Sequence, residues 1–154
     1  MPKSSFKQNF GAIAVALVVF FLGATFVLTR PVQGIQTSAV AGLRTLQMTA
    51  AQSTPYSEAI VNGKPSFIEF YADWCTTCQA MAPTLEKASE KFASDVNFVM
   101  LNIDDPQWQS TVATYKVTGV PHFVLLEADQ TAVDTFIGKV PLPILSERLS
   151  NLVS

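Results

Sequence analysis

Two cysteines separated by two residues carry the most reactive chemistry in this sequence. Cys75 and Cys78 enclose two threonines, and the 154-residue chain has no other cysteine. A C-x-x-C pair serves either redox exchange or metal binding. A zinc site needs four ligands, and the chain has one histidine, His122, so a complete mononuclear site is disfavoured. A disulfide closing so short a loop removes little entropy from the unfolded chain, which favours thiol chemistry over a structural bridge.

The cysteines lie where a predicted strand passes into a predicted helix. Residues 65–71 (PSFIEFY) form a short apolar run typical of a buried strand. Residues 76–92 space apolar side chains three and four apart, which predicts a helix kinked by Pro83. Cys75 would then sit at the helix N-terminus, where free amides and the helix dipole favour the thiolate. We therefore expect Cys75 to attack and Cys78, carried inward, to resolve the mixed disulfide.

The helix caps and apolar runs in the rest of the sequence predict an α/β domain over residues 54–154. Thr54 and Pro55 resemble an N-cap followed by proline, which would open a short helix to Val61. Apolar runs and periodicity predict a strand at 96–103, a helix at 108–115, a hairpin of strands at 121–127 and 131–137, and a helix at 142–152. Alternating strands and helices argue for parallel strands, with an antiparallel edge contributed by the hairpin.

The N-terminal part of the chain differs from this domain in charge and hydropathy. Residues 1–57 carry four basic residues and no acid, whereas residues 58–154 carry six bases and twelve acids. The net charge of −2 disfavours a nucleic-acid binder. Residues 10–29 are uncharged and apolar on every face, and their core of 18 residues would span about 27 Å, so we predict a transmembrane anchor.

The charges that flank this span predict its orientation. Lys3 and Lys7 precede it and Arg30 alone follows closely, so residues 1–9 are expected to be cytoplasmic and the rest exported. A cleaved signal peptide is the alternative, but its apolar core would be shorter and its small-residue cleavage site closer. Residues 30–53, rich in small and polar residues, are interpreted as a linker, although Val40, Leu43 and Leu46 could form one face of a short helix.

Several motifs resemble the thioredoxin superfamily. They are the stretch FYADWCTTC at 70–78, Pro83 after the second cysteine, LNID at 101–104 and Gly119-Val120-Pro121. This resemblance covers residues 54–154 and implies the thioredoxin fold, a central mixed sheet flanked by helices. The anchor, FYADWC, NFVMLNID and the proline-histidine turn are most similar to membrane-anchored thylakoid thioredoxin-like proteins of cyanobacteria and chloroplasts. Thiol reductases of cytochrome c maturation are near neighbours.

The resemblance to the thylakoid proteins also implies a function. In that family the domain faces the lumen and supplies electrons for cytochrome b6f assembly. The chain would then be a protein thiol-disulfide oxidoreductase in a thylakoid or plasma membrane of a prokaryote. Its expected partners are disulfide-containing targets such as apocytochromes c and an integral membrane electron donor, with no cofactor, metal or nucleic acid. The alternatives are a disulfide-forming oxidase or isomerase, and a non-enzymatic module that carries metal on the two sulfurs.

Glu69 is the acid that the resemblance assigns to proton transfer. Thioredoxins carry a buried acid at the matching position, where it handles the proton of the resolving cysteine. In the middle of an apolar strand its pKa should rise, unless strand alternation turns it to solvent. The lysine that usually pairs with this acid is replaced here by Met100.

Three further residues are assigned to substrate binding. Pro121 matches the cis-proline of the superfamily, and the backbone of Val120 would pair with an extended target peptide. Trp74 is expected on the contact surface, with a core-edge aromatic as its alternative. His122 either lies near the sulfurs or faces away on its strand. Because the two threonines between the cysteines add no positive charge to stabilise a thiolate, we expect a reductant rather than an oxidant.

Overall fold

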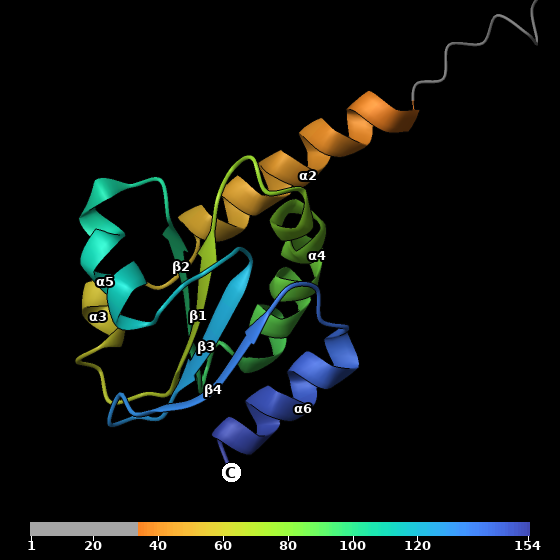
Figure 1. Ribbon diagram of the computed structural model, residues 1–154. Coiled ribbons are helices and arrows are strands. Elements are labelled where there is room, and N and C mark those ends of the chain that lie inside the picture. The colour runs from red at the N-terminus through yellow and green to blue at the C-terminus, as the bar shows by residue number, and fades with distance from the viewer. Residues whose placement is uncertain (1–33) are drawn as a thin grey trace, which may run out of the picture. The chain divides into compact units, whose positions relative to one another are not determined.

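The computed structural model describes residues 34–154, so the predicted cytoplasmic segment 1–9 and membrane span 10–29 lie outside the described residues. Among the helices that are described, none combines the length and the apolar character needed to cross a bilayer. Residues 36–154 form one compact unit (Figure 1).

The elements of this unit alternate between helices and strands. In chain order they are α2 (Gly34–Ala51), α3 (Tyr56–Ala59), β1 (Ser66–Tyr71), α4 (Thr76–Phe92), β2 (Asn97–Asn102), η1 (Pro106–Trp108), α5 (Gln109–Thr114), β3 (His122–Leu126), β4 (Ala132–Ile137) and α6 (Leu142–Leu152). The predicted helices at 76–92 and 142–152 are confirmed with these bounds. Each carries a clear apolar stripe, which is why the sequence pattern predicted it.

The strands form a mixed sheet in the order β2-β1-β3-β4. Only β1 and β2 are parallel, whereas β3 runs antiparallel to both β1 and β4. The expectation of mainly parallel strands was therefore wrong, since the segment after β2 crosses to the far side of β1 and enters β3 in the opposite direction. The predicted architecture, a mixed sheet flanked by helices, is confirmed.

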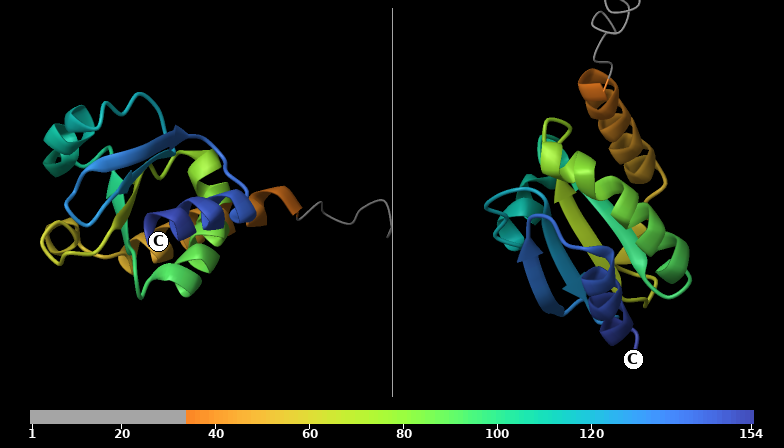
Figure 2. Two further views of the ribbon diagram at one scale, coloured as in Figure 1. Left: turned by 90° about the horizontal axis from the view of Figure 1, so that it is seen from below. Right: turned by 90° about the vertical axis from the view of Figure 1, so that its right-hand side faces the viewer.

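Helices cover both faces of the sheet (Figure 2), and an apolar core lies on each face. On one face, Phe67 and Phe123 pack against Leu85 of α4 and Leu145 of α6. On the other face, Phe70 packs against the side chains of α3 and α5. Every residue of β1 is buried for this reason. Each large apolar side chain that is fully buried stabilises the fold by about 2 kcal/mol, so β1 is held rigidly at the centre.

Two sequence expectations before β1 need correction. The segment predicted as a linker over 30–53 is helical over Gly34–Ala51, and Leu46 is fully buried. The N-cap of α3 is Pro55 and not Thr54. The amide of Thr54 instead donates to the carbonyl of Phe98 at 2.7 Å, which ties this segment to the edge strand β2 and delays the helix.

Candidate functional site

The two cysteines form a disulfide at the start of α4. Their Cα atoms are 5.2 Å apart, within the range that an unstrained disulfide spans. Cys75 is the N-cap of the helix and has an extended backbone, and Cys78 lies in the first turn. Cys75 keeps 5% of its surface exposed, whereas Cys78 is fully buried. Both cysteines are therefore buried, and Cys75 is the one that keeps some accessible surface.

The helix start makes the Cys75 sulfur a hydrogen-bond acceptor. The amide of Cys78 donates to Cys75 Sγ at 3.0 Å. In the reduced protein this amide would stabilise a thiolate better than a thiol, because hydrogen bonding to the charged form lowers a pKa. The local sequence supports this cap, since Ala72 O accepts from the Cys75 amide at 3.1 Å and so turns the chain from β1 into α4.

Glu69 lies behind the cysteines, in the middle of β1. Its side chain is fully buried, and neither carboxyl oxygen has a hydrogen-bond partner among the described residues. Burial raises its pKa well above the usual range for a carboxyl. The alternative that strand alternation exposes it is wrong, because helices cover both faces of the sheet.

The strand pattern also shows which face Glu69 occupies. It alternates with Phe67 and Tyr71, and these two side chains pack against α4, Tyr71 in the same cluster as both cysteines. Glu69 therefore faces α4. Met100 is its direct neighbour on β2, so the position that would supply a cationic partner holds a thioether. Because Met100 is uncharged, this neighbour on β2 does not lower the pKa of Glu69.

Trp74 is exposed next to the disulfide. It keeps 64% of its surface accessible, and its indole nitrogen donates to Asp104 Oδ2 at 2.8 Å. This hydrogen bond orients the ring from the end of β2. The interpretation of Trp74 as a core-edge aromatic is therefore wrong, and the side chain is free to contact another molecule.

Val120 and Pro121 stand beside the cysteines from a distant part of the sequence. The peptide bond between them is cis, as the resemblance implied. Val120 packs on the cluster that contains both cysteines. The carbonyl of Pro121 accepts from the amide of Gly138 at 2.9 Å, whereas within residues 34–154 the backbone of Val120 has no hydrogen-bond partner. This main chain is available to an extended peptide.

His122 belongs to the opposite face of the sheet. Its ring meets Phe70 edge-on at 6.0 Å between centroids, in the core under α5. It is buried, neither nitrogen has a partner in the described part of the chain, and burial lowers its pKa. The residue is therefore held neutral and away from the sulfurs, which agrees with the interpretation that it faces away.

Helix α2 contributes to the site in a way that was not predicted. Leu46 is in the cysteine cluster, and Gln47 Nε2 donates to Asp73 Oδ2 at 3.1 Å. A signal was present in the sequence, because Gly42, Leu46 and Ala50 recur every four residues and would share one face of a helix. Two of these three residues are small, so the stripe carries little apolar surface and is easily overlooked.

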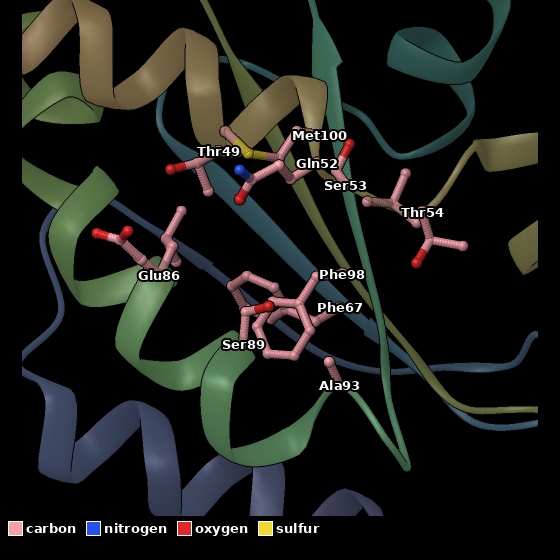
Figure 3. Close-up of a pocket in the computed structure, with 12 residues that line it drawn as sticks. Thr49, Gln52, Ser53, Thr54, Phe67, Glu86, Ser89, Ala93, Phe98 and Met100 are labelled. Atoms are coloured by element: carbon pink, nitrogen blue, oxygen red, sulfur yellow. The ribbon is translucent and has the colours of Figure 1, made fainter.

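Two further features of the unit were candidates for a ligand site, a cluster of metal-binding side chains and a cavity beside α2. Within residues 34–154, no group of three or more histidine, cysteine or acidic side chains is placed to hold a metal ion. A cavity of about 80 Å³ lies between the end of α2, α4 and β2 and is lined by residues such as Thr49, Ser89 and Phe98 (Figure 3). It is much smaller than the pockets that hold cofactors, and no cysteine lines it.

The sequence matches the family model described as thioredoxin over residues 47–151. It is 44% identical over 109 residues to the thiol:disulfide interchange protein TxlA homolog of Synechocystis, an alignment covering 71% of this chain and 61% of that protein. It is 41% identical over 146 residues to TxlA of Synechococcus elongatus, covering 95% of this chain and 71% of that protein. It is 35% identical over 153 residues to the chloroplastic thioredoxin-like protein HCF164 of Arabidopsis thaliana, covering 99% of this chain and 55% of that protein.

The relatives are longer than this chain, and a solved structure shares its fold. The chain spans only 61% and 55% of the Synechocystis and Arabidopsis proteins. Among solved structures, a mutant thioredoxin from Halobacterium salinarum superposes with a TM-score of 0.56 and 27% identity, covering 63% of this chain and 81% of that chain.

Proposed function

The chain belongs to the thioredoxin family, and on that premise we propose that it is a thiol-disulfide oxidoreductase that reduces disulfides in other proteins. The observation that carries the proposal is the disulfide at the N-terminus of α4, with Cys75 less completely buried than Cys78 and a buried acid on the strand behind it. The names of the cyanobacterial relatives, which describe thiol:disulfide interchange, support the same activity.

The first step uses the reduced form of the cysteine pair. The Cys75 thiolate attacks one sulfur of a target disulfide, forms a mixed disulfide and releases the other target sulfur as a thiolate. The exposed ring of Trp74 and the free backbone of Val120 hold the target peptide beside the sulfur. The target gains one thiol in this step.

The second step regenerates the disulfide seen in the structure. The Cys78 thiol loses its proton and attacks Cys75 Sγ, so the Cys75–Cys78 bond forms and the second target sulfur leaves as a thiolate. Glu69 accepts the Cys78 proton, and its raised pKa brings it closer to that of a thiol, which makes this transfer less unfavourable. Both target thiolates then take up protons from water and Glu69 returns its proton to water, so the target disulfide gains two electrons and two protons in total.

We place this domain on the exported side of a membrane, thylakoid or plasma, with residues 10–29 as the anchor. The charge pattern of the N-terminal residues and the chloroplastic relative support this placement. There, an integral membrane donor would return electrons to the disulfide, and apocytochromes c during cytochrome b6f or c-type cytochrome assembly are the proposed targets. The resemblance to the thylakoid proteins supports these targets.

The reduction potential of the Cys75–Cys78 pair tests the direction. The first turn of α4 contains no basic residue, and His122 packs on Phe70 on the far face of the sheet, so neither supplies a cation that would favour the reduced form. Equilibration of the full chain with glutathione or dithiothreitol buffers should give a potential below about −200 mV. The variant Thr77→His is the matched control and should raise the potential by about 30 mV or more. A wild-type value near −120 mV would identify an oxidant.

Labelling of Cys75 tests the placement. Vesicles that carry the full chain and expose the exported face of the membrane, right-side-out for a plasma membrane and inside-out for a thylakoid, are treated with an impermeant reductant and then with an impermeant maleimide. We expect labelling without detergent, because an exported domain lies on the outer face of these vesicles and Cys75 keeps some accessible surface. The variant Cys75→Ser serves as the control for labelling elsewhere. Labelling that requires detergent would place the domain in the cytoplasm and remove the need for a membrane donor.

A further inference from the structure

Helix α2 is an addition to the family domain that touches the redox site. The family match begins at residue 47, so most of α2, including Gly42 and Leu46, precedes it. Yet Leu46 is the one fully buried side chain within residues 40–51. The cluster that it enters contains both sulfurs and consists of Leu46, Tyr71, Ala72, Cys75, Cys78 and Ala82. The helix thus adds a buried apolar side chain to the cluster that holds the cysteine pair.

The approach of α2 to α4 is close at the cysteine end. A Cβ added at Gly42 would lie 3.2 Å from Cβ of Gln79, the residue that follows Cys78. Such a distance is tighter than nearly all real contacts of a Cβ, so only glycine leaves the two helices in place without a shift. A residue with a side chain at position 42 would push α2 away from the first turn of α4.

Polar contacts hold the same end of the helix. Gln47 Nε2 donates to the carboxylate of Asp73, two residues before Cys75, and Gln79 Nε2 donates to the Asp73 carbonyl at 2.7 Å. Toward the C-terminus of α2, by contrast, the cavity between Thr49 and Ser89 separates α2 from α4 (Figure 3). The packing of α2 on α4 is therefore concentrated beside the cysteines.

From these contacts we infer that Leu46 is a positioning residue for the redox reaction: it seals the buried sulfur of Cys78 from water and small thiols. The inference rests on the proposed function, in which the resolving thiol must react only with the mixed disulfide on Cys75. Without the Leu46 side chain, the apolar cover over Cys78 opens. Stray thiols and oxidants then reach the resolving sulfur directly.

Alkylation of Cys78 tests this role separately from catalysis. In the full chain with Cys75→Ser, Cys78 is the only thiol, so the rate of iodoacetamide labelling reports its protection. Leu46→Ala should increase that rate about ten-fold or more, and Leu46→Met should return it to near the parent value. Leu145→Ala is the matched control, since Leu145 of α6 is also fully buried but belongs to a different apolar cluster, which contains neither cysteine.

A second variant keeps the test decisive if Leu46→Ala folds poorly. Gly42→Leu displaces α2 from Gln79 while it raises the helix propensity of the segment, so it separates docking from helix formation. It should expose Cys78 to a similar extent. Equal labelling in the Leu46→Ala and Leu145→Ala chains, or full protection in Gly42→Leu, would overturn the inference. Either result would leave the reductase proposal intact, because that proposal depends on the potential and on target capture.

Discussion

Cys78→Ser should capture target proteins as mixed disulfides on Cys75, whereas Cys75→Ser should capture few and lose activity by about three orders of magnitude or more. The reason is the unequal exposure of the two sulfurs. Cys75 keeps some accessible surface and accepts the Cys78 amide at the helix start, while Cys78 has no accessible surface. Only Cys75 can therefore begin the exchange, and only Cys78 can release the product.

The measurement is a non-reducing gel of membranes from the native host that express each variant. Bands that disappear with dithiothreitol are expected for Cys78→Ser alone, and the double variant with both serines is the control for other adducts. Identification of the captured chains would then test apocytochromes c as the proposed targets. Similar capture by both single variants would contradict the assigned order of attack.

The parts of the fold that the sequence predicted well are those with strong local patterns. Helices α4 and α6 each carry a stripe of apolar residues at helical spacing, and their predicted bounds agree with the structure. The run PSFIEFY predicted β1 because a short apolar segment with aromatics fits a strand that is covered on both faces. The burial of Glu69 followed from the same run, since its neighbours on both sides are apolar.

The errors lie where distant contacts decide the structure. Helix α2 has a weak apolar stripe, and the burial of Leu46 depends on a surface that β1 and α4 build from later residues. The direction of β3 depends on which side of β1 the chain returns to, and a one-dimensional pattern does not contain that information. The hydrogen bond from Trp74 to Asp104 joins residues thirty positions apart, so only the parallel pairing of β1 and β2 reveals it.

Glu69→Gln should change both the stability of the protein and its rate of turnover. In the unfolded chain the carboxyl of Glu69 has the ordinary glutamate pKa of about 4.3. The folded protein holds this proton to a higher pH, because burial raises the pKa of Glu69. Between the two pKa values the unfolded state binds fewer protons, so the free energy of unfolding of the wild type falls as the pH rises.

The difference in stability between Glu69→Gln and the wild type should therefore depend on pH. Below about pH 4 both states of the wild type are protonated, and the difference should be constant. Above that pH the free energy of unfolding of the variant should increase relative to that of the wild type by about 1.4 kcal/mol per pH unit. This increase should stop at the pH where the carboxyl ionises in the folded wild type. Urea unfolding of the oxidised full chain at several pH values measures this. Glu90→Gln, which changes an exposed residue on α4, is the matched control.

Turnover should move in the opposite direction from stability. Glutamine at position 69 fills the same space but accepts no proton from Cys78, so the resolving step should slow by about 100-fold, and the mixed disulfide should persist. Stopped-flow measurement of the decay of that intermediate isolates the step from the first attack by Cys75. A variant that gains stability at neutral pH and loses the resolving step would show that the buried carboxyl is kept for proton transfer at the expense of the fold. If the free energies of unfolding of variant and wild type instead ran parallel with pH, and the mixed disulfide decayed at an unchanged rate, Glu69 would have no role in proton transfer.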